Sequence, residues 1–212
     1  MSEIGDQVTW SEKLEKVFAS NGEKAHALSM LHKRAEALYS QRRTIIDLPV
    51  IIGSAAIGFL NAGSTSMFPD PKYSSIALGI GSLIVGVLQT INTYFNWSKR
   101  AEGHRIAAIQ YGKLYRFLSL ELALPRNERL SPASLLKQTK DTYDRLQEIS
   151  PLVPDAIIDE FKKQTSKYTD VARPEETNGL EKIEVYNPLR SPPSDLVRQE
   201  TIGIPITPLP HS

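Results

Sequence analysis

The sequence predicts an all-α protein: a transmembrane helical hairpin with a cytoplasmic helical bundle and an extended Pro-rich C-terminal tail. Three observations predict this class. Two apolar stretches interrupt an otherwise polar chain, apolar residues recur at helical spacing on either side of them, and half of the 14 prolines follow residue 169. The chain then divides into amphipathic helices in residues 1–43, the hairpin in 44–95, a helical domain in 96–169 and the tail in 170–212.

Residues 9–43 carry apolar side chains at helical spacing, which predicts amphipathic helices before the hairpin. Gly22 lies in the segment SNGE at residues 20–23 and is expected to divide this region into two helices. The second of them can run directly into the first apolar stretch. Pro49 would then lie inside a helix, where proline removes one backbone hydrogen bond and can introduce a kink.

The hairpin is predicted from the apolar stretches at residues 44–62 and 74–95. At a rise of 1.5 Å per residue, helices of about 19 to 22 residues span roughly 30 Å, the thickness of the hydrocarbon core of a bilayer. Asp47 is the one acidic or basic residue in these stretches, and it lies one turn from the entry. The alternative is a pair of buried helices in a soluble bundle, because such helices can also be apolar on all sides.

Basic residues flank the outer ends of the hairpin. They are Lys33, Arg34, Arg42 and Arg43 before it, and Lys99, Arg100 and Arg105 after it. The linker between the stretches holds one acid, Asp70, and one base, Lys72. By the positive-inside rule, both termini are expected on the cytoplasmic side of a membrane. A soluble core hairpin has no reason to show this asymmetry, so the charges favour a lipid bilayer as the partner of the hairpin.

Small and polar residues recur along the second stretch at alternating intervals of four and three. They are Ser75, Gly79, Ser82, Gly86, Gln89 and Thr93, and the first stretch has a matching small-xxx-small face of Ser54, Gly58 and Ala62. In lipid, close packing and interhelical hydrogen bonds drive helix association, and small residues permit both. Two interpretations stay open: the seam packs the two helices of one chain together, or it faces another subunit of a homo-oligomer or a wet pore. Gln89 and Asn92 favour assembly, since polar side chains at membrane depth need partners.

Three further helices are predicted after the hairpin, over residues 98–122, 132 to about 149, and 155 to about 167. The first should pack on the N-terminal helix as a cytoplasmic bundle. Ser131 is a candidate N-cap with Pro132 at the first helical position, and Asp155 is a candidate cap of the last helix.

The C-terminal tail from residue 170 onward is rich in proline and is predicted to be extended or disordered in isolation. Such a tail is most often solvated, but a segment like GIPITPLP can also dock in a groove or along a lattice of partner proteins. The candidate partner-binding residues of this segment are Ile204, Pro205, Ile206, Pro208, Leu209 and Pro210.

The sequence shows no catalytic constellation, so no enzyme is predicted. The four histidines are His26, His32, His104 and His211. Glu102 and His104 are two positions apart, so on a helix they point to different faces, and no metal or cofactor is expected. Asp144, Arg145 and Glu148 in DTYDRLQE could form a polar network, but a solvated helix face accounts for them better.

Composition excludes other classes. A formal charge of +1 is too even to argue for nucleic-acid binding. There is no cysteine for a disulfide framework or a thiolate metal site. The start MSEIGDQVTW is polar and acidic rather than basic and apolar, so no cleaved signal peptide is expected, and the first apolar stretch is expected to direct insertion.

Several segments resemble the two-transmembrane SLATT superfamily. They are HALSMLHKRAEALYSQRRTIIDLPVIIGSAAIGF, then the second apolar stretch, then AEGHRIAAIQYGKLYRFLSLELALPRNER and YDRLQEISPLVP. The likeness is closest to the version encoded by large nucleocytoplasmic DNA viruses, although Gly103 stands where the EAHR-like motif has alanine. The resemblance covers roughly residues 25–161 and leaves both ends unexplained.

The resemblance implies a membrane hairpin with cytoplasmic helices, and bacterial members are interpreted as pore-forming effectors. Two functions are therefore expected. In the first, the protein is a structural component of a virion, such as a minor capsid protein, that anchors the internal membrane to capsid proteins through its tail. In the second, it is an oligomeric pore-forming or membrane-remodelling effector.

Overall fold

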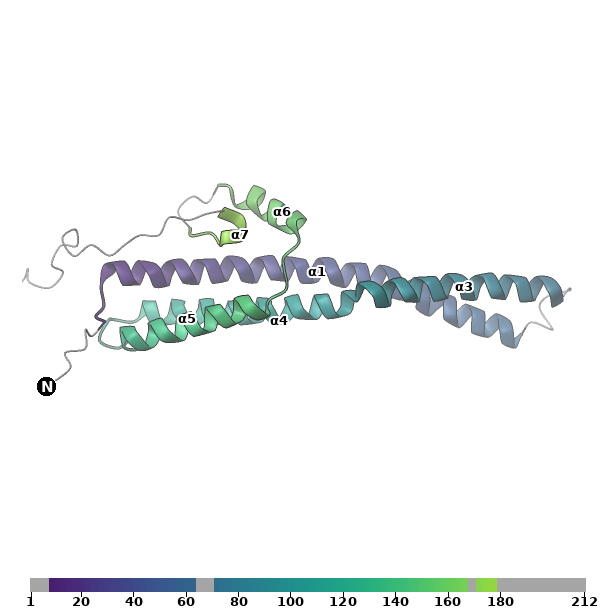
Figure 1. Cartoon of the computed structure of the whole chain (residues 1–212), viewed down its shortest axis with the longest axis horizontal. Helices are drawn as coiled ribbons and strands as arrows, with labels where there is room; N and C mark the ends of the chain where they lie inside the picture. The colour runs from purple at the N-terminus through teal and green to yellow at the C-terminus, as the bar shows by residue number, and fades with distance from the viewer. Residues whose placement is uncertain (1–7, 64–70, 168–170, 179–212) are drawn as a thin grey trace, which may run out of the picture. The chain divides into compact units, whose positions relative to one another are not determined.

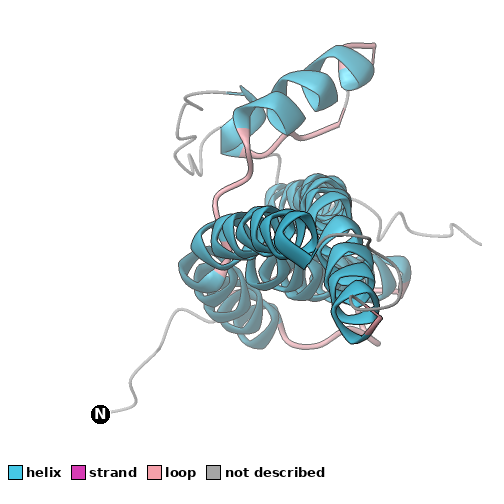
Figure 2. Cartoon of the chain, turned by 90° about the vertical axis from the view of Figure 1, so that its right-hand side faces the viewer, coloured by secondary structure: helices cyan, strands magenta, loops and turns pink. Residues whose placement is uncertain are grey.

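The computed structural model describes residues 8–63, 71–167 and 171–178, which form helices joined by loops and no strand (Figures 1 and 2). The helices are α1 (Glu12–Ala62), α3 (Pro71–Phe95), α4 (Trp97–Ala123), α5 (Pro132–Ile149), α6 (Asp155–Thr165) and α7 (Glu175–Asn178). The all-α prediction is therefore confirmed for the described residues.

Helix α1 is one continuous helix of 51 residues. The Ser11 side chain caps its start by accepting a hydrogen bond from the Leu14 N–H at 3.2 Å. The predicted break at residues 20–23 is wrong, because Gly22 is buried where α1 meets α4, and a Cβ there would lie 3.6 Å from the Leu118 Cβ. One glycine costs a helix only about 1 kcal/mol, which packing along a long neighbour outweighs. Pro49 lies inside α1, as predicted.

Helices α3 and α4 are separated by a single residue, Asn96. Its backbone is left-handed, with φ 47° and ψ 46°, a conformation that asparagine tolerates better than most residues. Helical hydrogen bonding continues on both sides of it: the Asn96 N–H donates to the Asn92 carbonyl at 3.0 Å, and the Arg100 N–H donates to the Asn96 carbonyl at 3.2 Å. The apolar α3 is therefore joined to the polar α4 without an intervening loop.

Helices α1 and α4 lie side by side and antiparallel (Figure 1). On each helix the buried residues recur every three or four positions, mostly in alternation, which is the spacing of a coiled-coil seam. On α1 they include Phe18, Gly22, Ala25, Leu28, His32, Ala35 and Tyr39, and on α4 they are His104, Ala107, Tyr111, Leu114 and Leu118. We call residues 12–43 of α1 together with α4 the helical pair.

One antiparallel register runs through the helical pair and on into the apolar segments, residues 44–62 of α1 and 74–95 of α3. Contacts along it are Gly22 with Leu118, His26 with Tyr115, Ser29 with Ala108, Asp47 with Asn92, Gly53 with Val85, and Ile57 with Gly81. The apolar segments are therefore a direct continuation of the helical pair.

Helices α5 and α6 complete the core around the helical pair. Ser131 caps α5 by accepting a hydrogen bond from the Ser134 N–H at 3.3 Å, with Pro132 in the first turn, so this prediction is confirmed. Asp155 is the first helical residue of α6 and not its cap, because the extended Pro154 takes that position. The apolar core contains Leu135 and Leu146 of α5, and Ile157 and Phe161 of α6.

Residues 171–178 depart from the extended tail predicted from residue 170. They form a turn and the short helix α7, and the Ala172 N–H donates a 2.6 Å hydrogen bond to the Glu23 carboxylate of α1. Pro174 and Thr177 are buried. These contacts hold residues 171–178 against the folded part of the chain.

Candidate functional site

The described chain has two helices that are long and apolar enough to cross a membrane. Each of the two helices contains an apolar window of 18 residues. In α1 no part of this window is buried within the chain, and in the second helix 6% of the window is buried. Core helices of a soluble bundle would be covered by the rest of the chain. The two segments instead expose most of their large apolar side chains, so we treat this hairpin as the candidate functional site.

The two segments contact each other along one stripe on each helix. On α1 the half-buried residues include Ile46, Val50, Gly53, Ile57 and Leu60, and on α3 Ser74, Leu78, Gly81, Val85, Leu88 and Asn92 are buried or half-buried. The helices approach each other closely at two glycines. A Cβ on Gly53 would lie 2.9 Å from Val85 Cγ2, and one on Gly81 would lie 3.4 Å from the Ile57 side chain.

The small residues predicted to mediate helix association lie outside this contact stripe. Those on α1 are Ser54, Gly58 and Ala62, and those on α3 are Ser75, Gly79, Ser82, Gly86, Gln89 and Thr93; all nine are exposed. A Cβ built on Gly58, Gly79 or Gly86 would have nothing within 4 Å among its described surroundings. The interpretation in which this seam packs the two helices of one chain together is therefore wrong.

The small residues of both helices lie on the same side of the hairpin. On α3 each of the six follows a contact residue by one position, as Gly86 follows Val85, and on α1 Ser54 and Gly58 follow Gly53 and Ile57. One residue is a rotation of roughly 100° about a helix axis. A two-fold axis perpendicular to the plane of the two helix axes exchanges two antiparallel helices and leaves each side of that plane in place. A residue one position after a contact residue therefore lies on the same side of the hairpin in both helices. We call these nine residues the small-residue face.

Two polar residues of α3 have different surroundings. The Asn92 side chain donates a 2.6 Å hydrogen bond to Asp47 Oδ1, and Arg43 Nε donates to Asp47 Oδ2 at 2.9 Å. Asn92 is therefore satisfied within the chain and does not favour assembly, contrary to the sequence-based argument. Gln89 is exposed, and its side chain has no hydrogen-bond partner among the described residues.

A stack of four aromatic rings, which the sequence analysis missed, lies in the helical pair. Tyr39 stacks on His104 with ring centroids 5.4 Å apart, and His32 stacks on Tyr111 at 5.6 Å. Between them, the Nδ1 atoms of His32 and His104 are 2.8 Å apart. The available signal was the coiled-coil spacing, because each histidine occupies a regular position in its seam.

Both histidines are held in the neutral form. Burial, and secondarily the charge of His104, lowers the pKa of His32 from 6.5 to about 4. Burial also lowers the pKa of His104, with a further contribution from the Arg100 charge. One neutral ring can donate its Nδ1–H to the Nδ1 lone pair of the other, whereas two imidazolium rings would present two donors to each other. The close contact therefore requires that at least one of the two rings is neutral.

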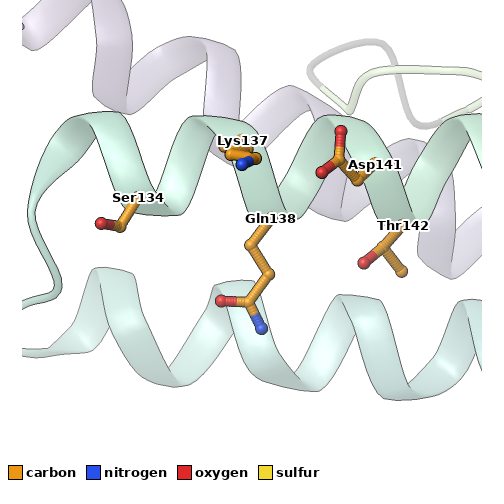
Figure 3. Close-up of a pocket in the computed structure, with 5 residues that line it drawn as sticks. All are labelled: Ser134, Lys137, Gln138, Asp141 and Thr142. Carbon is orange, nitrogen blue, oxygen red and sulfur yellow. The ribbon is translucent and has the colours of Figure 1, made fainter.

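The remaining sequence candidates lie apart from these features. Asp144, Arg145 and Glu148 are exposed on α5. A shallow pocket of about 350 Å³ runs along α5, and Figure 3 shows its lining residues on that one helix, with Gln138 extending toward a neighbouring helix. Within the described residues no three His, Asp or Glu side chains come together as a metal site would require. The six partner-binding candidates, residues 204–210, lie outside the described residues.

The fold and the candidate site define a class: an all-helical protein whose antiparallel helical pair continues into a hairpin with the length and composition of membrane-spanning helices. Comparisons with protein-family models, with curated proteins and with solved structures find no match to the chain.

Proposed function

We propose that this chain is a two-pass membrane protein that self-associates in the bilayer through its small-residue face. The observation that carries the proposal is the exposure of Gly58, Gly79 and Gly86 on one side of the hairpin, where no described residue lies within 4 Å of a Cβ built on any of them. Glycines stabilise helix contacts in lipid by permitting close approach, and no described helix of the same chain uses these three. Gln89 on the same face supports the proposal, because an amide in lipid is stabilised by a hydrogen-bond partner.

The asymmetric basic flanks support an orientation with both termini on the cytoplasmic side. The helical pair would then extend directly from the membrane into the cytoplasm. Since its register continues into the apolar segments, assembly in the membrane would bring several helical pairs together. This arrangement agrees with the resemblance to SLATT proteins and favours a pore-forming or membrane-remodelling activity.

Self-association is tested by adding bulk to the small-residue face. Gly86→Leu should abolish oligomers in cross-linking experiments on liposomes, and it should abolish dye leakage from them if the assembly is a pore. Ala77→Leu is the matched control, because Ala77 is also exposed on α3 but lies outside the face. Undiminished oligomers in Gly86→Leu would exclude the face as the interface. Oligomers without leakage in the unmodified protein would retain the assembly and exclude the pore.

A second candidate is a structural role in a virion, with the hairpin in an internal membrane and the tail on capsid proteins. Its support is the sequence of the tail, with the apolar and proline residues of GIPITPLP as the docking segment, and the resemblance to the viral SLATT version. Mass spectrometry of purified virions should detect the protein in stoichiometric amounts. Its absence from such particles would reject this role and leave self-association untouched.

A further inference from the structure

Two arginines from different helices converge on one tyrosine at the base of the helical pair. The guanidinium carbon of Arg42 in α1 lies 5.8 Å from the centre of the Tyr39 ring, and that of Arg100 in α4 lies 5.9 Å from it. Tyr39 is only 8% exposed and is fixed by its stacking on His104. Two exposed cations therefore lie within about 6 Å of the centre of one buried ring, a distance at which cation–π contacts form.

These two charges are not neutralised within the described part of the chain. The neighbouring arginines are neutralised, because Arg43 pairs with Asp47 at 2.9 Å and Arg105 pairs with Glu102 at 2.7 Å. No acidic side chain among the described residues forms an ion pair with Arg42 or Arg100. Two like charges at one ring repel each other, and an anion that binds both removes this repulsion.

The position of the two arginines matches the headgroup layer of a bilayer. Arg42 precedes the first apolar segment by two residues and Arg100 follows the second by five, which places them within about 3 and 8 Å of the segment ends along the helices. The headgroup layer is about 5–7 Å thick on each side of the hydrocarbon core. Arg42 would therefore lie within this layer and Arg100 at its outer edge, where the long arginine side chains can reach the lipid phosphates.

We propose that Arg42 and Arg100, supported by Tyr39, form a binding site for the phosphate of an anionic lipid headgroup. Each guanidinium group can donate two parallel hydrogen bonds to phosphate oxygens, a geometry that lysine does not reproduce. A lipid is favoured over a soluble phosphate because Ile45, one turn below Arg42, is 59% exposed and offers an apolar surface to an acyl chain. This inference rests on the proposed insertion into a membrane.

The test measures the thermal unfolding midpoint of the full chain in detergent while phosphatidylglycerol or phosphatidylcholine is added. Phosphatidylglycerol should raise the midpoint more than phosphatidylcholine does. In the double variant Arg42→Gln with Arg100→Gln this difference should disappear, and Arg42→Lys with Arg100→Lys should lower the apparent lipid affinity about tenfold. The matched control, Lys113→Gln with Arg116→Gln, removes two charges farther along α4 and should keep the full difference.

Three outcomes overturn the site: a double glutamine variant that keeps the full preference, a control that loses it equally, or an unmodified protein that shows no preference. Equal stabilisation by glycerol 3-phosphate, which has the phosphate without acyl chains, would overturn the lipid assignment. Reconstitution separates this inference from the proposed function. A chain that stays in liposomes after an alkaline wash but shows no lipid preference refutes the site alone, whereas a chain that does not insert refutes the membrane proposal.

Discussion

His32 and His104 meet in the interior of the helical pair with their Nδ1 atoms 2.8 Å apart. The two residues are 72 positions apart in sequence and belong to the helices that continue into the two apolar segments. Tyr39 and Tyr111 stack on the two histidine rings, and the charge of Arg100 acts on His104. This contact links the protonation state of the interior to the pairing of α1 with α4.

Stability should fall as the pH falls from about 6.5 to about 4. In the unfolded chain His32 has its ordinary pKa of 6.5, whereas burial lowers the pKa in the folded chain to about 4, so between these values the unfolded state binds more protons. The stabilisation is complete above pH 6.5 and decreases by about 3 kcal/mol by pH 4. Thermal midpoints in detergent across this range measure the effect, and a flat profile between pH 7 and pH 4.5 would contradict it.

Replacing one histidine should cost more than replacing both. In His32→Leu, the ring of His104 remains buried without its partner, which costs about 1–3 kcal/mol in unfolding free energy. Adding His104→Leu removes the unpaired group and should recover most of that loss. A double-mutant cycle from chemical denaturation measures the coupling, and additive losses would show that the contact contributes nothing of its own.

Two glycines of the continuous register should respond oppositely to alanine. Gly22→Ala places a Cβ in ordinary contact with Leu118 and should stabilise α1 by about 0.5–1 kcal/mol. Gly53→Ala places a Cβ 2.9 Å from Val85 Cγ2, inside normal carbon contact, and should destabilise the hairpin by about 1–3 kcal/mol. Thermal midpoints compare the variants, and Val85→Ala should rescue Gly53→Ala if the steric clash is the cause.

A second acid-sensitive contact lies at the far end of the helical pair. Glu15 accepts hydrogen bonds from Arg126 at 2.8 and 3.0 Å and from Arg129 at 2.6 Å, and chiefly the Arg126 hydrogen bond lowers the pKa of Glu15 from 4.5 to about 2. Its stabilisation is complete above pH 4.5 and is lost as the pH falls toward 2. Glu15→Gln should cost about 1 kcal/mol at neutral pH and remove this low-pH phase, while the phase between pH 6.5 and pH 4 remains.

The proposed topology can be tested with single cysteines, because the chain has none of its own. In a cell, a membrane-impermeant maleimide should label Ser66→Cys in the linker from outside the cytoplasm, and should label Lys113→Cys of α4 only after permeabilisation. Labelling of Lys113→Cys before permeabilisation would contradict a two-pass hairpin with cytoplasmic termini. The unmodified chain is the background control.

Local patterns in the sequence predicted several features well. The helical class, the two apolar segments and the cap at Ser131 depend on composition and on interactions within a few residues, so a single segment contains the information. The small residues of the hairpin were also recognisable. Their sequence spacing did not reveal which stripe faces the partner helix, because the contact stripe with Val85 and the exposed stripe with Gly86 have the same spacing and differ by one residue.

The errors arose where distant segments meet. The sequence indicated a break at Gly22, which its contact with Leu118 overrides, and a role in assembly for Asn92, which Asp47 satisfies within the chain. The sequence also predicted that residues 171–178 begin an extended tail, although the carboxylate of Glu23 binds their backbone. Each of these outcomes depends on a partner at least 45 positions away, which no local pattern specifies.

By itself, then, the sequence determined that the chain is helical and that two of its segments have the length and apolar composition of membrane spans. The tertiary structure alone decided that His32 and His104 share the interior, that the apolar segments continue the helical pair in one register, and that the small-residue face remains exposed. The reason is physical: the propensity and hydrophobicity of a segment are properties of its own residues, whereas register is set by which side chains of two distant helices pack together.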